Sequence, residues 1–542
     1  MKTKVIGPPG CGKTTYLIGK VGEYINSGLH PMEIVYTTFT KAGAREAMRR
    51  ALIEFPHYSE EDFPHFATTH SIAFHILGIG GKVFTDTKLK EFGDKYGHNF
   101  SARSSAFDSV MTETMLSEKG DYLEFFDCWR KNCLYEDIQE AFEDFTEANQ
   151  RNLPHWWSLA VVESYIEGKN EFKREEGLFD FSDFLLGCLE RQLCPPGMKV
   201  LLVDECQDNN QLMQKVHQLW AEAAEDAYVV GDPNQAIFEF QGSNPALFID
   251  MAADRTENLR QSWRCSKAVH ELARKVITRN SIRMIDDDFT PTEAAGVVER
   301  IDVKDIDWGE LIKDGATLFY LLRTRWLVTQ AYDRLMTAGV PFVSSRGLES
   351  PLGHLDMEGR FIQAALARSA VTMLTLSDAR PVMLSSLADL TKHIPAKPYM
   401  KHGSKAELQR RAKDNPGKEV GITALPELGF TPRFLEYLNE SDFTHPLKGT
   451  PEEKDYLLRV YGRYGEGAFH GRPPIALGTM HSSKGAEADT VVIDPTYTRL
   501  PWESMNTLEG REAENRLAYV SVTRAREKVI ILEPQWDKAY EY

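Results

Sequence analysis

The fold is decided near the start of the chain, by the stretch Lys4-Val5-Ile6-Gly7-Pro8-Pro9-Gly10-Cys11-Gly12-Lys13-Thr14-Thr15. It joins a short apolar run to a glycine-rich loop and then to a helical pattern, with the spacing G-x-x-x-x-G-K-[ST] of a phosphate-binding loop. Glycines let backbone N–H groups surround phosphates at the positive end of a helix. We therefore expect the loop residues Gly7, Pro8, Pro9, Gly10, Cys11, Gly12, Lys13, Thr14 and Thr15 to bind a nucleotide, with Lys13 on its β- and γ-phosphates.

Short apolar strands alternate with helical segments along two parts of the chain. In the first part, strands are expected at 34–37, 200–203 and 227–230, and the pattern restarts at 317–322, 340–344, 475–479, 490–493 and 528–532. This alternation is typical of a parallel, doubly wound sheet. It predicts an α/β protein with two cores, each interrupted once: a first core of 1–71 and 186–265 with a helical insertion at 72–185, and a second core of 266–345 and 471–542 with a partly mobile insertion at 346–470.

Composition bounds the class of protein. With 542 residues the chain is too long for one core, and no apolar run approaches the roughly 18 residues that span a membrane. The N-terminal residues run straight into a strand, so no signal peptide is expected, and the seven cysteines form no C-x-x-C pair, which favours a reducing cytoplasm. The net charge of -17 argues against a non-specific DNA coat, so any nucleic acid is expected to be held by local basic strips and stacking aromatic rings.

Two adjacent carboxylates follow the expected strand at 200–203. An aspartate at a strand end can hold Mg²⁺ together with the loop hydroxyl, and a glutamate beside it can activate water as a general base. We therefore expect Asp204 and Thr14 to hold Mg²⁺ and Glu205 to act as the base. A kinase needs no water-activating glutamate here, so the pair favours a nucleotide hydrolase.

Five further stretches resemble motifs of the UvrD/Rep/PcrA helicases of superfamily 1A. Asp204-Glu205-Cys206-Gln207-Asp208 resembles motif II, and Gly231-Asp232-Pro233-Asn234-Gln235-Ala236-Ile237-Phe238-Glu239-Phe240-Gln241-Gly242 resembles motif III. Leu259-Arg260-Gln261-Ser262-Trp263-Arg264, Thr479-Met480-His481-Ser482-Ser483-Lys484-Gly485-Ala486-Glu487 and Glu514-Asn515-Arg516-Leu517-Ala518-Tyr519-Val520-Ser521-Val522-Thr523-Arg524-Ala525 resemble motifs IV, V and VI. The matches follow the family's order through both expected cores. The chain thus resembles a small, divergent member of this helicase family. The resemblance implies that it acts in the cytoplasm of a bacterial cell or of a phage-infected host.

The resemblance implies two RecA-like cores and a role for each matched residue. Gln235 would bond the γ-phosphate and the attacking water, while Arg264 and Arg524 would be arginine fingers from the second core or its junction. Trp263 would cover the adenine, with Gly485 and Glu487 also at the nucleotide. Phe39, His70, Phe238 and Phe240 would stack on or bracket bases, and Thr479 and His481 would contact DNA phosphates.

The implied function is an ATP-dependent, Mg²⁺-dependent 3′-to-5′ helicase on single-stranded DNA and on tailed or forked duplexes. The polarity follows from the resemblance, because Gln235-Ala236-Ile237-Phe238 differs from the Gln-Leu-Pro of the opposite branch. Three alternatives stay open: a translocase that removes bound proteins but unwinds weakly, a motor on RNA, and a binding subunit without catalysis. The complete set of ATP-site residues disfavours the last of these.

Two departures from the family pattern limit what the resemblance implies. The chain begins six residues before Gly7, where the family usually has a glutamine-bearing segment that reads adenine, so selectivity for ATP over other nucleotides stays open. Gln241 stands where the family commonly has an arginine that supports the DNA strand. A looser grip on DNA is therefore expected.

Overall fold

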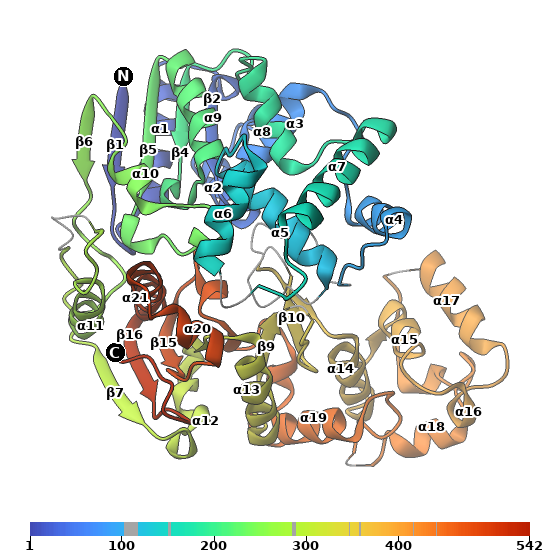
Figure 1. The fold of residues 1–542 in the computed structure, drawn as a ribbon. Helices are drawn as coiled ribbons and strands as arrows, with labels where there is room; N and C mark the ends of the chain where they lie inside the picture. Colours follow the sequence, from blue (N-terminus) through green and yellow to red (C-terminus); the bar gives the residue numbers. More distant parts are fainter. Residues whose placement is uncertain are drawn as a thin grey trace. The chain divides into compact units, whose positions relative to one another are not determined.

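A six-stranded sheet forms the first α/β core (Figure 1). Its order is β3-β2-β4-β5-β1-β6, and every neighbouring pair is parallel. The strands are β1 (Lys2–Ile6), β2 (Ile34–Thr38), β3 (Phe66–Thr68), β4 (Val200–Val203), β5 (Asp226–Gly231) and β6 (Arg255–Asn258). Strands β2 and β4 are buried along their whole length, which explains their continuous apolar sequences.

Helices cover both faces of this sheet. On one face, α1 (Lys13–Asn26) and α2 (Lys41–Glu54) pack Leu17 and Ala47 against Tyr36 and Leu202. The other face is covered by α3 (Thr69–Leu77), α8 (Phe181–Glu190) and α9 (Gln211–Ala223). The predicted doubly wound arrangement is therefore confirmed.

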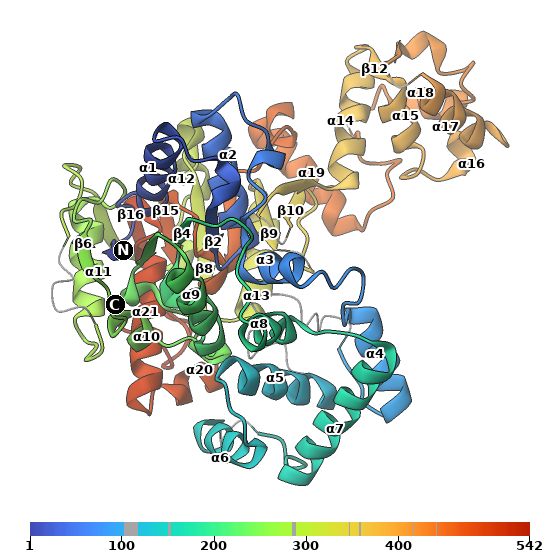
Figure 2. The same cartoon turned by 90° about the horizontal axis from the view of Figure 1, so that it is seen from above.

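A helical segment interrupts the first core between α3 and α8. It comprises α4 (Asp86–Tyr96), α5 (Lys119–Asn132), α6 (Ile138–Asn149) and α7 (Leu159–Glu176), as Figure 2 shows from above. Its core is rich in aromatic rings and also contains Lys169, whose ammonium lies 2.8 Å from Asp127 and 2.7 Å from Glu124. Buried charges of this kind are tolerated only when they are paired.

The second sheet has eight strands in the order β11-β10-β9-β14-β8-β15-β16-β7. It is parallel from β10 to β15, with β11 antiparallel at the edge. The strands are β7 (Val297–Ile301), β8 (Leu318–Leu322), β9 (Phe342–Ser345), β10 (Gly353–Leu355), β11 (Phe361–Gln363), β14 (Ile475–Thr479), β15 (Ala488–Ile493) and β16 (Ala525–Leu532). Beside them stand α12 (Trp308–Leu311), α13 (Arg325–Ala338) and α19 (Pro451–Tyr464).

A second insertion leaves this sheet through α14 (Ala365–Ser377) and is mostly helical (Figure 2). It contains β12 (Val382–Met383), α15 (Leu384–Leu390), α16 (Ala396–Tyr399), α17 (Ser404–Asp414), β13 (Glu419–Val420) and α18 (Pro432–Tyr437). The basic residues between Lys401 and Lys413 lie mainly on α17. The fold is thus α/β with two parallel-sheet cores, each carrying a helical insertion.

This computed structural model describes residues 1–101, 118–149, 153–283, 289–345, 347–356, 359–415, 417–440 and 442–542. By internal contacts the chain forms two compact units. The first unit is Met1–Val298, Tyr497–Glu527 and Lys538–Tyr542, and the second is Glu299–Thr496 and Lys528–Asp537. The first unit therefore also holds α10 (Pro245–Ile249), α11 (Lys267–Ile277), α20 (Arg499–Ser504) and α21 (Leu508–Val522). The domain boundaries expected from sequence stay a prediction.

Within the described ranges, no helix combines the length and the apolar character that crossing a membrane requires.

Candidate nucleotide and nucleic-acid site

The glycine-rich loop joins the end of β1 to the start of α1. Gly7 N donates to Gly231 O at 3.0 Å, which ties the loop to β5. Gly10 and Gly12 have φ values of 71° and 83°, the left-handed region that glycine adopts without strain. A Cβ on Gly10 would also lie 2.4 Å from the Cβ of Arg264, so this close approach requires glycine. The loop thus leads directly into the N-terminus of α1, where backbone N–H groups can bind phosphate.

Lys13 places a positive charge inside this loop. Its side chain is buried, and Nζ donates to Gly7 O at 2.9 Å. Burial is the largest single influence and lowers the pKa of Lys13, but Glu205, Cys11, Asp232 and Asp204 together outweigh it, so the net shift is upward. The ammonium thus stays charged and fits the predicted contact with phosphates.

Asp204 follows β4 and faces the first turn of α1. Its Oδ2 accepts hydrogen bonds from Thr14 Oγ1 at 2.9 Å and from the Tyr36 hydroxyl at 2.7 Å. Burial, with the neighbouring Glu205, raises the pKa of Asp204, and the opposing effects of Tyr36, Lys13 and Thr14 offset this rise only in part.

Thr14 and Asp204 together fit a magnesium ion. A hydroxyl and a carboxylate are oxygen ligands of the kind that Mg²⁺ prefers, and such a site usually leaves its other positions to water and substrate phosphates. These two residues would hold the ion, which would neutralise phosphate charge when bound. The role of both residues as ligands remains a prediction.

Glu205 has an unusual backbone conformation for the predicted base. Its φ is 54°, in the left-handed region that costs a non-glycine residue roughly 1 kcal/mol. Gln207 Nε2 donates to Glu205 Oε2, and Gln207 Oε1 accepts from Asp232 N at 2.9 Å. Gln207 therefore fixes the glutamate against the end of β5.

Gln235 lies at the centre of a chain of hydrogen bonds. Its Nε2 donates to Asp232 Oδ2 at 2.6 Å, and its Oε1 accepts from Arg524 Nη2 at 2.9 Å. Arg524 follows α21 and is only 2% exposed. Burial, then the neighbouring Arg264, lowers the pKa of Arg524 to about 9. A desolvated guanidinium of this kind gains most from an anionic partner such as phosphate.

Arg264 and Trp263 lie against the glycine-rich loop. Trp263 N donates to Gly10 O at 2.8 Å, and Arg264 Nη1 donates to Thr523 O at 3.3 Å. The Trp263 side chain is 75% exposed, so its ring is accessible for the predicted stacking on adenine. The structure thus gathers the four predicted residues Gln235, Trp263, Arg264 and Arg524 in one unit.

Three of the four predicted base-contacting aromatic residues form a continuous row. Phe39 and Phe238 stack with centroids 5.1 Å apart, and Phe240 lies 6.2 Å from Phe238, edge to face. Phe238 is 2% exposed, whereas Phe39 and Phe240 are half-buried and present ring surface. His70 is separate from this row and packs near Phe181, and burial lowers its pKa to about 4.

Four predicted contacts lie in the second unit. Thr479 ends β14, and His481 follows in a short 3₁₀ turn; burial, then Arg323 and Lys484, lowers the pKa of His481 well below its usual range. Gly485 has a φ of 80°, and Glu487 is exposed. Their roles stay predictions.

Four residues of the site were not predicted to have a role, namely Tyr36, Gln207, Asp232 and Ser262. Ser262 Oγ donates to Pro9 O at 2.8 Å and fastens the loop to the segment that carries Trp263. Tyr36 could have been found from strand order, because β2 neighbours β4, the strand that ends at Asp204. The other three are recognisable only once the side-chain contacts are known.

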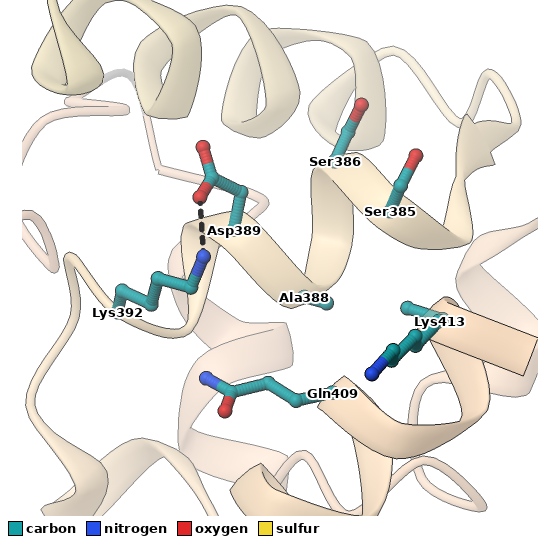
Figure 3. A pocket seen from close by; sticks show the side chains of 8 residues that line it. Ser385, Ser386, Ala388, Asp389, Lys392, Gln409 and Lys413 are labelled. Atoms are coloured by element: carbon teal, nitrogen blue, oxygen red, sulfur yellow. Dashed lines mark hydrogen bonds and ion pairs between the residues drawn. The ribbon is translucent and has the colours of Figure 1, made fainter. Parts of the chain in front are cut away.

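A shallow hollow of about 510 Å³ lies in the second insertion, between α15 and α17 (Figure 3). It is lined by Ser385, Ser386, Ala388, Asp389, Lys392, Gln409, Ala412 and Lys413. Lys392 is paired with Asp389 at 3.0 Å. The hollow contains none of the predicted nucleotide residues and is a separate, basic feature.

Comparison with known proteins agrees with this geometry. The model of the UvrD/REP helicase N-terminal domain matches residues 1–256, and that of the UvrD-like helicase C-terminal domain matches residues 465–534. The chain therefore belongs to the UvrD-like superfamily 1 helicases, a family of ATP-dependent DNA helicases, and the predicted resemblance is confirmed.

Individual relatives are similar over most of the chain. YjcD of Bacillus subtilis, named as an ATP-dependent DNA helicase, is 24% identical over 98% of this chain and 76% of its own length. The ATP-dependent DNA helicase UvrD2 of Mycobacterium tuberculosis is 24% identical over 96% of this chain and 75% of its own. DNA helicase II of Salmonella typhimurium is 24% identical over 67% of this chain and 61% of its own.

The first prediction concerns the base. Glu205→Gln keeps the shape and the hydrogen-bonding ability of the side chain but removes its basicity. ATP turnover should fall about 10²–10⁴-fold, while binding of a fluorescent ATP analogue is kept. Glu222→Gln, on the exposed surface of α9, is the control and should keep normal turnover. Near-normal turnover in Glu205→Gln would show that another group activates water.

The second prediction concerns the two arginines. Arg524→Ala and Arg264→Ala should each lower DNA-stimulated ATP turnover by about 10³-fold, because each removes a cation from the phosphate side of the site. Arg526→Ala, an exposed arginine two residues further on, is the control. Circular dichroism checks that each variant is folded. Normal turnover in both variants would mean that neither arginine reaches the phosphates.

Proposed function

We propose that this chain is an ATP- and Mg²⁺-dependent motor that moves 3′-to-5′ along single-stranded DNA and unwinds tailed or forked duplexes. The observation that supports it most is the hydrogen-bonded chain Asp232–Gln235–Arg524. A hydrolase that did no mechanical work would need a base and a metal site. It would not require the buried Gln235 amide to be bonded to both Asp232 and Arg524 immediately before the aromatic residues Phe238 and Phe240.

Few residues separate Gln235, expected at the nucleotide, from Phe240, expected at the DNA bases. Gln235 ends one 3₁₀ turn, and Phe240 lies in the next, formed by Glu239–Gln241. A shift of Gln235 on binding or loss of the γ-phosphate would therefore be passed through a few residues to Phe240. Stacking on a ring does not depend on base identity, which suits a motor that must step over any sequence.

Similarity to known helicases supports both DNA as the track and the 3′-to-5′ direction. The relatives YjcD, UvrD2 and DNA helicase II are named as DNA helicases. The direction rests on the sequence Gln235-Ala236-Ile237-Phe238, which resembles the 3′-to-5′ branch.

A translocase that clears bound proteins but unwinds weakly is the second candidate. It is favoured by the acidic charge of -17 and by Gln241, an uncharged side chain next to Phe240. Both features reduce the number of phosphate contacts that could resist the force of strand separation.

The third prediction tests direction and track together. ATP turnover should rise strongly with single-stranded DNA and little with RNA of the same sequence. A duplex with a 3′ tail should be unwound, whereas one with a 5′ tail should not. Unwinding from the 5′ tail, or equal stimulation by RNA, would contradict the proposal. Stimulation by DNA with displacement of a bound protein but no unwinding would favour the second candidate.

The fourth prediction concerns how DNA is held. Each neutralised phosphate of a single strand steepens the salt dependence of affinity by about 0.7 in logarithmic slope. With few such contacts the slope should be shallow, and Phe240→Ala should lose roughly 1–3 kcal/mol of binding for the base it stacks. Fluorescence anisotropy with a labelled oligonucleotide at several salt concentrations measures both.

The matched control for the fourth prediction is Trp326→Ala. Trp326 is 56% exposed in the second unit and lies outside the family motifs, so its removal should leave affinity unchanged. A steep slope with an unchanged affinity in Phe240→Ala would contradict the idea. It would assign the grip to basic side chains instead, with Lys405 and Lys413 of α17 as the first to replace.

A further inference from the structure

An ion pair between the buried Arg516 and the partly buried Glu239 links α21 to the aromatic segment at a second point. Arg516 Nη2 lies 2.6 Å from Glu239 Oε1, and the Arg516 side chain is 4% exposed. Its Nη1 is 3.7 Å from Glu512 on the same helix, so Glu239 is the nearer of the two carboxylates. Among the described residues, Arg516 Nε and Nη1 have no hydrogen-bond partner, and neither has Glu239 Oε1, so its 2.6 Å contact with Arg516 Nη2 is an ion pair. The buried cation therefore depends heavily on Glu239 for compensation.

The two links have a fixed spacing along one rigid element. Arg516 and Arg524 are eight residues apart, a separation of about 12 Å along a helix. Arg524 contacts Gln235 on the nucleotide side, and Arg516 contacts Glu239, the residue directly before Phe240. Both ends of the segment 235–239 are thus attached to α21 and its C-terminal cap.

The aromatic segment is also held from the helical insertion. Asn132 Nδ2 of α5 donates to Gln241 O at 3.3 Å, and Phe240 packs on the insertion's aromatic core. Glu239 therefore lies between two attachments. The residues that follow it, Phe240 and Gln241, contact the helical insertion, and Glu239 itself contacts α21. Loss of its ion pair with Arg516 would free the Phe240 end of the segment from α21 but leave that end attached to α5, while Gln235 keeps its bond to Arg524.

We propose that the Glu239–Arg516 ion pair is a positioning contact, which makes the segment carrying Phe240 move with α21 when the nucleotide state changes at Gln235 and Arg524. This inference rests on the proposed function. It assigns a role to two side chains that touch neither the nucleotide nor the track.

Ionisation of Glu239 provides a test that a purely structural role would not satisfy. Burial raises the pKa of Glu239 to about 7, an effect that Arg516 opposes and that Glu512 and Glu514 of α21 reinforce. On the α5 side, the titratable neighbour of Gly242 is Cys133, and burial raises its pKa to about 12, so it stays neutral. Glu239 is therefore charged above about pH 8 and increasingly protonated below about pH 6.

The fifth prediction is measured on the full chain with Glu239→Gln. This change keeps the shape of the side chain but removes its charge. DNA-stimulated turnover should fall about tenfold, within the usual range of coupling between sites, while turnover without DNA and KM for ATP stay within about twofold. In the unaltered chain, stimulation by DNA should rise as pH increases through about 7 relative to Glu239→Gln, because only the former gains the ion pair.

Glu33→Gln is the control, since it removes an exposed pair with Lys199 at 2.8 Å. It should leave both rates and the pH profile unchanged. The inference is overturned if Glu239→Gln keeps full DNA stimulation, if its pH profile matches that of the unaltered chain, or if both rates fall together with the melting temperature. Absence of DNA stimulation in the unaltered chain would instead refute the proposed function itself.

Discussion

The parallel register of β1, β4 and β5 is the constraint on which the nucleotide site depends. Ile6 is paired with Gly231, and Val203 with Val229, so the three strands end at one edge of the sheet. The glycine-rich loop, Asp204 and Asp232 each follow one of these ends and therefore meet there. A shift of one residue in either pairing would separate Thr14 from Asp204 and cost this buried carboxylate one of its hydrogen bonds.

Helix α21 brings an arginine side chain to this edge of the sheet. Its C-terminal end carries Arg524 to Gln235, and one residue earlier Thr523 O accepts a bond from Arg264. These contacts bring the half-buried Arg264 close to the buried guanidinium of Arg524, and burial, then this neighbouring like charge, lowers the pKa of Arg524. In the proposed function, a phosphate bound beside these two arginines would act on α21 directly.

Much of this could be predicted from sequence, because the local motifs have strong spacing rules. The loop, the Asp204–Glu205 pair and the alternation of strands and helices each follow from short-range patterns, and the family confirms the fold. What could not be predicted depends on packing between distant segments. Phe238 was expected to meet bases, yet its ring lies beneath Phe39, and no sequence pattern distinguishes a buried ring from an exposed one at that spacing. The contact of Glu239 with Arg516 likewise arises from packing between distant segments.

The central claim is that the nucleotide state passes through Gln235 to α21 and to the aromatic segment. Amide hydrogen exchange, with and without Mg²⁺ and a non-hydrolysable ATP analogue, tests it most directly. Protection should change together in the loop at 7–15, in 233–241 and in 516–524, and in Gln235→Ala it should change in the loop alone. Two results would contradict the claim. One is a change in protection confined to the loop in the unaltered chain, and the other is that Gln235→Ala still changes protection in all three segments.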